Sequence, residues 1–245
     1  MGVIRVSKKV YFDAGHGGSD PGAVKYVREA DVNIKVVNFA VDYLTKYFEV
    51  DVKKDITGDS INAITNRANQ WKADLFVSVH FNAGGGDGFE ALVYSSENKG
   101  LGVCFEKYVK QTGQNSRGVK YRPDLGVLRL TKMNAILCEI AFVDNKKDIS
   151  DWDEDAELKV MGRALALACA DWLDLPVKSE SVTYMTLEPM NFRKSPDLKS
   201  QILEVIPKGS VLVGTEVSGG WLKTTHKKKS GYARIEGQKI YMKKM

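Results

Sequence analysis

Along the first 175 residues, short apolar runs alternate with longer stretches in which apolar residues recur every three or four positions. A short apolar run is typical of a buried strand, whereas the wider spacing is typical of one face of a helix. Strands are predicted at residues 9–13, 49–53, 74–81, 89–95 and 135–144, and helices at 30–48, 60–72, 99–113 and 154–173. Ser60 is the predicted N-cap of the second helix. This alternation favours an α/β fold, with a mostly parallel sheet and helices on both faces.

The pattern changes after residue 175. Pro176 is expected to end the last helix, and a short polar stretch follows it. Seven short strand-like runs separated by turn residues come next, at 181–187, 191–195, 202–206, 210–218, 221–225, 232–236 and 240–244. We therefore predict a first domain at residues 1–175, a linker at 176–181 and a small all-β barrel at 182–245.

Charge is distributed unevenly over the two predicted domains. Residues 178–245 carry 13 Lys and Arg against 6 Asp and Glu, while the rest of the chain carries 23 against 25. This asymmetry predicts that the C-terminal domain binds an anionic partner. We do not expect that partner to be nucleic acid, because the barrel shows no ladder of aromatic and basic residues on which bases could stack.

The composition is typical of a soluble globular protein, with 43% hydrophobic and 27% charged residues. No run approaches the ~18 apolar residues of a membrane span. The first residues lack the apolar core of a secretory signal, and Val6 departs from the myristoylation pattern. Cys104, Cys138 and Cys169 are widely spaced and are interpreted as buried free thiols in a reducing compartment. We expect synthesis in the cytoplasm without a signal peptide, and no membrane insertion.

Two of the three histidines end predicted strands. His16 follows "VYFDAG", and His80 ends "LFVSVH". The carboxyl ends of parallel strands meet at one edge of a sheet, where α/β proteins bind ligands, so the two imidazoles can lie close together. Glycines beside His16 and Asn82 beside His80 favour a metal site over two unrelated structural histidines.

Glu29 is the best candidate for a third ligand. It ends the loop that carries His16 and lies just before the predicted helix. Two histidines and one carboxylate leave a fourth position open, as catalytic zinc sites do. The alternative is a carboxylate that only stabilises the N-terminus of the helix.

Glu139 interrupts "AILCEIAF", a strand that is otherwise fully apolar. A carboxylate there is costly to bury unless it is paired or functional. We interpret it as a general base that takes a proton from metal-bound water and passes it to a leaving amine. A salt bridge at the edge of the sheet is the alternative.

Other chemistries lack their motifs. "GHGGSD" does not complete Gly-x-Gly-x-x-Gly, and the chain has no P-loop, so nucleotide binding is not supported. No Gly-x-Ser-x-Gly occurs, and His226 lies in the basic C-terminal part, which excludes a serine triad of that kind. The glycines indicate a loop whose backbone a bulky substrate can approach.

Six separated motifs follow one another over roughly residues 9–173: "DAGHGGSDPGAV", "READVNI", "NRANQWKADLFVSVHFNAG", "RGVK", "LGVLR" and "AILCEIAFVDN". In this order they resemble the landmarks of the zinc-dependent N-acetylmuramoyl-L-alanine amidases of the Amidase_3 type. The resemblance implies one zinc ion per chain bound by His16, Glu29 and His80, with Glu139 as the catalytic residue. Ala30 stands where the family usually has Lys. Asn82 is either a substrate contact or a turn residue.

The substrate implied by the resemblance is bacterial peptidoglycan, cleaved between the lactyl group of N-acetylmuramic acid and L-alanine. "MNFRKSPD", "VIPKGSVLVGTEVSGGWLKT" and "SGYARIEGQKIYM" resemble SH3-like (SH3b) cell-wall-binding domains, although "YAR" replaces the usual "GW". Such a domain could also attract anionic wall polymers. An amidase joined to it, without a signal peptide, is similar to a phage endolysin, which acts on the wall after release from the cytoplasm.

Three alternatives remain open. The chain could be a bacterial autolysin or spore-related amidase, which would act on the same bond. It could be a zinc peptidase acting on wall peptides, since the same metal chemistry hydrolyses any amide. It could also be a non-catalytic protein that only binds the cell wall.

Overall fold

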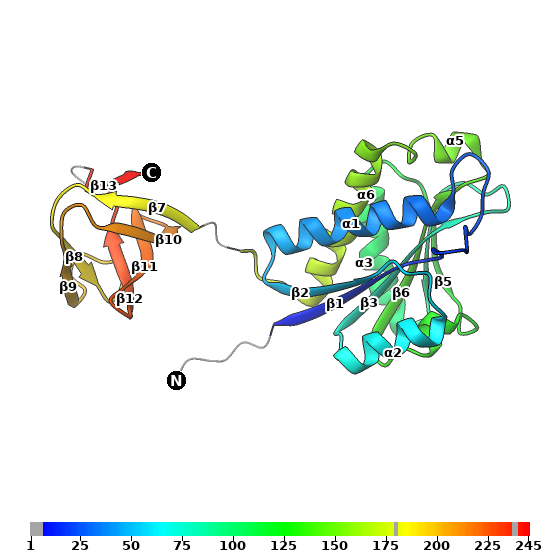
Figure 1. The fold of residues 1–245 in the computed structure, drawn as a ribbon, viewed down its shortest axis with the longest axis horizontal. Coiled ribbons are helices and arrows are strands. Elements are labelled where there is room, and N and C mark those ends of the chain that lie inside the picture. The colour runs from blue at the N-terminus through cyan, green and yellow to red at the C-terminus, as the bar shows by residue number, and fades with distance from the viewer. Residues whose placement is uncertain (1–6, 179–180, 237–239) are drawn as a thin grey trace. The chain divides into compact units, whose positions relative to one another are not determined.

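The structure is a computed structural model that describes residues 7–178, 181–236 and 240–245 (Figure 1). The chain divides into two compact units, Met1–Lys178 and Ser179–Met245. Each unit has its own sheet and its own apolar core.

The first unit contains a six-stranded sheet with the order β2-β1-β3-β6-β4-β5. Its strands are β1 (Lys8–Ala14), β2 (Val50–Asp55), β3 (Leu75–Asn82), β4 (Phe89–Val93), β5 (Ser116–Tyr121) and β6 (Asn134–Phe142). β2, β1, β3 and β6 run parallel, whereas β4 is antiparallel to β6 and β5 follows the direction of β4. The predicted α/β fold is confirmed, and two strands at one side of the sheet run against the other four.

Helices cover both faces of this sheet (Figure 1). The larger cluster of buried residues joins one face to α1 (Glu29–Tyr47), α3 (Lys99–Lys110) and α6 (Asp155–Leu173). A smaller cluster joins the other face to α2 (Ile61–Trp71) and to the short helix α4 (Gly126–Arg129). Two further short elements are η1 (Ser96–Asn98) and α5 (Lys146–Ile149). Ser60 caps α2 as predicted, because its side chain accepts a hydrogen bond from the backbone N–H of Ala63.

The last helix of the first unit ends where the sequence predicted, but Pro176 is not the residue that ends it. α6 ends at Leu173, and Asp174 adopts the left-handed conformation that closes many helices, with φ 50°. The next residues remain bonded to the first unit: the Pro176 carbonyl accepts from Glu49 N–H, and Lys178 N–H donates to the Tyr47 carbonyl. Of the predicted linker, residues 179 and 180 lie outside the described residues, and residue 181 already opens the next strand.

The second unit is a seven-stranded antiparallel sheet with the order β13-β7-β10-β11-β12-β8-β9. Its strands are β7 (Ser181–Thr186), β8 (Met190–Arg193), β9 (Ile202–Ile206), β10 (Val211–Val217), β11 (Trp221–His226), β12 (Lys229–Arg234) and β13 (Met242–Lys244). Phe192, Leu212 and Leu222 lie in its small apolar core. The predicted all-β character is confirmed; residues 237–239 of the final motif lie outside the described residues.

No helix in the described part of the chain is long and apolar enough to cross a membrane. Cys138 and Cys169 are buried and Cys104 is partly exposed; all three are free thiols. The prediction of buried thiols is therefore correct for two of the three.

Candidate metal centre

His16, Glu29 and His80 meet at the edge of the sheet where β1 and β3 end. His16 lies two residues beyond β1, Glu29 is the first residue of α1, and His80 lies near the end of β3. Ala14 pairs with Val79 in the parallel register of β1 and β3, which brings the residues just after β1 beside His80. The fold thus joins three residues that are up to 64 positions apart in the sequence.

One carboxylate oxygen of Glu29 joins both imidazoles. His16 Nε2 lies 3.2 Å from Glu29 Oε1, and His80 Nδ1 lies 3.0 Å from the same atom. One ligand atom from each of the three residues lies within 4.8 Å of the others. Two imidazole nitrogens and a carboxylate oxygen at this spacing could bind one metal ion.

Backbone and side-chain contacts hold the three groups in place. Glu29, which is only 4% exposed, accepts hydrogen bonds from the backbone N–H groups of Ala23 (2.8 Å) and Phe81 (3.2 Å). His16 Nδ1 lies 2.8 Å from Asp20 Oδ2. A carboxylate bonded to the second nitrogen fixes the orientation of a ligating imidazole in many metal sites, so Asp20 is a positioning residue that the sequence patterns did not identify. A carboxylate four residues after His16 in the same loop was the signal.

The charges of these groups depend on one another. Burial alone would raise the pKa of Glu29, but the hydrogen bonds from His16, His80 and Ala23 hold that pKa well below its usual range. The hydrogen bond to Glu29 raises the pKa of His16 to about 9. Burial would lower the pKa of His80, but the bond to Glu29 and the nearby charge of Glu139 raise it instead. A cation would therefore have to displace protons from the two imidazoles, and its affinity would fall as the pH falls.

Two glycines allow these side chains to come so close. A Cβ atom at Gly15 would lie 2.1 Å from atoms of the His80 ring. A Cβ atom at Gly22, where φ is +63°, would lie 2.6 Å from Glu29 Oε2 and 2.7 Å from the His16 ring. The glycines of "DAGHGGSDPG" thus make room for the protein's own ligands, a reason different from the substrate access that the sequence suggested.

Glu139 lies next to this centre on β6. The parallel register pairs His80 with Glu139, so their side chains leave the same face of the sheet on neighbouring strands. Glu139 Oε2 is buried and has no hydrogen-bond partner. Burial raises the pKa of Glu139 to about 7, partly opposed by the charge of His80. A carboxylate with an unpaired oxygen and a pKa near neutrality is suited to accept and donate a proton in a reaction.

On the other side of Glu139 lies a carboxylate that the sequence patterns did not identify. Glu90 on β4 is paired with Glu139 in the antiparallel register. Its Oε1 accepts hydrogen bonds of 2.5 Å from both Arg117 and Lys120 on β5. The two cations hold the pKa of Glu90 below its usual value, although burial acts in the opposite direction. Glu90 therefore stays charged and paired, while Glu139 beside it is free to change its protonation state.

Asn82 contacts Glu90 rather than the three converging residues. Its side-chain amide donates to Glu90 Oε2 over 3.4 Å, and its carbonyl oxygen accepts from the N–H of Ala83 over 2.8 Å. Asn82 is the last residue of β3 rather than a turn residue, and its contact with substrate stays a prediction. His226, in contrast, belongs to β11 of the second unit and takes no part in the centre.

The glycine-rich loop after β3 is held by residues that follow β6. Asp144 accepts from the N–H groups of Gly84 and Gly85, and Asn145 donates to the Gly86 carbonyl. Asp148, which is buried, accepts from the N–H groups of Gly88 and Phe142 and from the side chain of Gln114. The polar residues that directly follow the apolar strand were the available signal for this clamp.

Loss of the Asp148 carboxylate should destabilise the first unit. Asp148→Ala removes three hydrogen bonds and leaves buried donors without an acceptor, so we expect the free energy of unfolding to fall by about 3 kcal/mol. Urea denaturation of the full chain measures this change. Asp151→Ala is the matched control, because Asp151 is exposed and should change the free energy by less than about 0.5 kcal/mol. Equal effects of the two substitutions would contradict the role of Asp148.

Relatives of known type share the first unit. Residues 10–171 match the model of a family described as N-acetylmuramoyl-L-alanine amidase. The chain is 39% identical over 188 residues to the endolysin of Bacillus phage SPP1, covering 71% of this chain and 69% of that protein. It is 35% identical over 171 residues to the N-acetylmuramoyl-L-alanine amidase CwlM of Bacillus licheniformis, covering 64% of this chain and 66% of that protein.

Two solved structures are similar in fold to about two thirds of this chain. The catalytic domain of CwlV, an N-acetylmuramoyl-L-alanine amidase from Bacillus (Paenibacillus) polymyxa var. colistinus, superposes with a TM-score of 0.65 at 27% identity. The superposition covers 69% of this chain and 99% of that domain. Cwp6 from Clostridium difficile superposes with a TM-score of 0.63 at 29% identity, over 68% of this chain and 29% of that protein.

Proposed function

The chain belongs to the N-acetylmuramoyl-L-alanine amidase family, and from this we propose that it cleaves bacterial peptidoglycan between the lactyl group of N-acetylmuramic acid and L-alanine. The observation that carries this proposal is the convergence of His16, Glu29 and His80 beside the unpaired Glu139. The relatives named above include an endolysin and N-acetylmuramoyl-L-alanine amidases, and the convergent residues lie within the matched segment.

We assign His16, Glu29 and His80 as ligands of one zinc ion. Imidazole and carboxylate donors suit zinc, and three protein ligands are the usual set of a catalytic site. Asp20, bonded to the outer nitrogen of His16, supports this assignment because ligating histidines commonly have such a partner. Bound zinc would supply a Lewis acid for the scissile carbonyl and would lower the pKa of a water molecule.

Glu139 is the residue that would move the proton. Its carboxylate accepts a proton from the attacking water as the water oxygen bonds to the lactyl carbonyl carbon. When the carbon–nitrogen bond breaks, Glu139 returns that proton to the nitrogen of L-alanine, which leaves as an amine. Buried surroundings favour this cycle, because they keep the pKa of Glu139 close to neutrality.

For the second unit we propose an SH3b-like role in wall binding. The unit is an antiparallel β-structure, and residues 178–245 carry 13 Lys and Arg against 6 Asp and Glu, whereas the rest of the chain is slightly acidic. Its partners would be the peptidoglycan of the wall, which the first unit cleaves, and anionic wall polymers. By similarity to the phage relative, we propose that the protein acts as an endolysin, made in the host cytoplasm and acting on the wall after release.

Metal content and reaction products, measured on one sample, test this proposal. We expect about one zinc per chain, and digestion of purified peptidoglycan should release L-alanine amino termini without new reducing sugars. Amino termini of another residue would indicate a zinc peptidase. Absence of zinc and of any release, with the protein still sedimenting with walls, would indicate a non-catalytic binding protein. His16→Ala should lose zinc, while Lys110→Ala, at an exposed position of α3, should keep it.

The pH profile gives an independent prediction. A general base must be deprotonated, so kcat/KM should fall as the pH falls through the pKa of Glu139. Burial raises that pKa from 4.5 to about 7, and a bound cation would lower it again. The acid limb measured in a pH–rate profile should therefore have its midpoint between these two values. If the residual activity of Glu139→Gln kept the same limb, another group would be responsible for it.

A further inference from the structure

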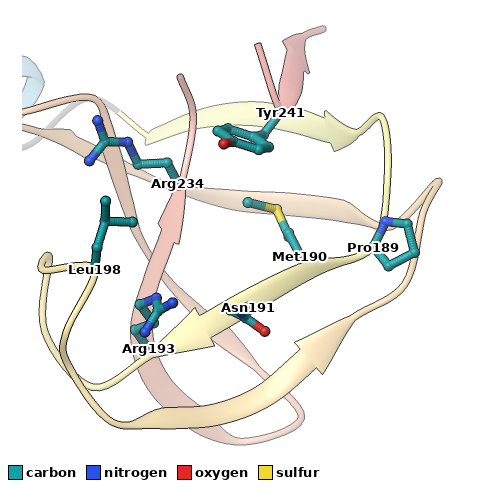
Figure 2. A pocket seen from close by; sticks show the side chains of 7 residues that line it. All are labelled: Pro189, Met190, Asn191, Arg193, Leu198, Arg234 and Tyr241. Carbon is teal, nitrogen blue, oxygen red and sulfur yellow. The ribbon is translucent and has the colours of Figure 1, made fainter. Parts of the chain in front are cut away.

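The second unit contains a pocket of about 670 Å³ formed around β8 and β12 (Figure 2). Arg193 and Asn191 enter it from β8, and Arg234 enters it from β12. Its volume lies within the range of small-ligand sites. Nothing in the family match covers this part of the chain, because that match ends at residue 171.

Strand alternation explains how the two arginines come to line the same pocket. β8 and β12 are antiparallel neighbours, and the pair Phe192–Ala233 points into the apolar core. Successive side chains of a strand point to opposite faces, so Asn191 and Arg193 share the outer face of β8, and Arg234 lies on the outer face of β12. The two guanidinium groups therefore occupy one surface of a two-stranded ladder.

Both guanidinium groups are held in position without being neutralised. Arg193 Nη1 donates to the Ser200 carbonyl over 2.8 Å. Arg234 donates to the Glu236 carbonyl and lies 5.1 Å from the centre of the Trp221 ring. Glu204 pairs with His226 and Lys227, and Glu216 pairs with Lys244; no ion pair between described residues of this unit includes Arg193 or Arg234. The pocket therefore offers two fixed positive charges to a ligand.

The remaining lining is mostly carbon. Figure 2 shows Leu198 on the same side of the pocket as the two arginines, and Tyr241 and Met190 on the opposite side. Leu198 is 62% exposed and lies on the loop between β8 and β9. An anion attached to a sugar or polyol would contact these groups through its carbon atoms and the arginines through its oxygens.

We propose that this pocket binds a phosphodiester group of an anionic wall polymer. The inference rests on the proposed wall-binding role of the second unit and names the site and ligand for that role. Arginine forks match the oxygens of phosphate with two parallel hydrogen bonds. A repeating phosphodiester chain carries many negative charges, which would also be attracted by the excess of lysines over acids in residues 178–245. A single carboxylate of a stem peptide would gain less from that excess.

The test uses the full chain and a fluorescent poly(glycerol phosphate) oligomer. Arg193→Gln and Arg234→Gln should each raise the Kd for this oligomer about tenfold, because each removes charge-assisted hydrogen bonds. Lys229→Gln is the matched control: it removes one charge at the other end of β12 and should change the Kd less than about twofold. Poly-L-glutamate of equal charge should bind at least about tenfold more weakly than the phosphate oligomer.

Both arginines also donate to backbone carbonyls of their own unit, so replacing them could disturb its fold. A second variant therefore tests the pocket at a side chain without these bonds. Leu198→Asp places a negative charge on an exposed position at the pocket and should weaken binding about as much as the arginine substitutions. Val213→Asp, at a position on β10 that is 58% exposed, is its control and should have little effect. The circular dichroism and melting temperature of both variants should match the parent.

Three results would overturn the proposal. These are parental binding by the arginine variants and Leu198→Asp, an equal loss in Lys229→Gln, or binding to polymer-free peptidoglycan as tight as to the oligomer. The last result would assign the pocket to a peptidoglycan stem peptide. Release of L-alanine termini from polymer-free peptidoglycan is measured separately. Failure of that release with intact oligomer binding would remove the amidase proposal and leave the pocket assignment standing.

Discussion

Glu139→Gln should lower kcat/KM for peptidoglycan hydrolysis by about 1,000-fold, within the range found for loss of a general acid–base group. The amide has nearly the same shape as the carboxylate but cannot take a proton from water. Glu139 Oε2 has no hydrogen-bond partner in the structure, so no structural bond is lost with it. Release of L-alanine amino termini measures the effect.

Zinc content and wall binding distinguish this outcome from damage to the fold. Glu139→Gln should keep the zinc stoichiometry of the parent and sediment with walls as the parent does, because Glu139 is not one of the three converging ligand residues. Glu97→Gln, an exposed residue of η1, makes the same chemical change and should keep full activity. A Glu139→Gln protein that released alanine termini within a few-fold of the parental rate would leave the catalytic assignment without support.

The sequence predicted most elements of the first unit but not the direction of every strand. Apolar runs identified β1, β3, β4 and β6, because buried strands of a covered sheet are apolar on both faces. β5 was missed because "SRGVKY" is polar and only partly buried at the side of the sheet. The reversal of β4 and β5 depends on pairing between distant strands, which the pattern of a single strand does not contain.

The three converging residues were predictable from the sequence, whereas the charged group beside Glu139 was not. His16 and His80 stand out because each ends a strand at the same edge of the sheet. Glu90 looks like one acidic residue in an apolar strand, and its partners Arg117 and Lys120 lie 27 and 30 positions further along the chain. Their pairing depends on the register of β4 and β5, which includes an irregularity between Phe89 and Ala91.

The end of α6 was predicted at the right residue, because the helix predicted at 154–173 ends at Leu173, but the cause of its ending was not. Proline was the visible signal near residue 176, but Asp174 already closes the helix with a left-handed backbone. The residues after it then bond to the end of α1 and the start of β2. A proline predicts where a helix cannot continue, whereas the actual end depends on which partners the released backbone finds.

Gly15→Ala should abolish zinc binding and lower kcat/KM at least about 100-fold while the first unit stays folded. The added methyl group would lie 2.1 Å from the His80 ring, a distance at which the ring has to move. Because His80 Nδ1 lies 3.0 Å from Glu29 Oε1, a displaced ring can no longer bind the same metal ion as Glu29 and His16. The backbone of Gly15 does not oppose the substitution, because Gly15 does not have the positive φ that its neighbours His16 and Gly17 have.

Gly100→Ala is the matched control for this substitution. A methyl group there meets Trp172 at 3.7 Å, an ordinary contact, and alanine in α3 should stabilise the helix by about 0.5–1 kcal/mol. Zinc analysis, the melting temperature and the rate of alanine release should be measured on both proteins. If Gly15→Ala bound one zinc and kept parental activity, the approach of His80 to the backbone would not matter for the site. Loss of zinc in Gly15→Ala but not in Gly100→Ala would show that the site needs glycine at position 15 because the His80 ring lies against its backbone.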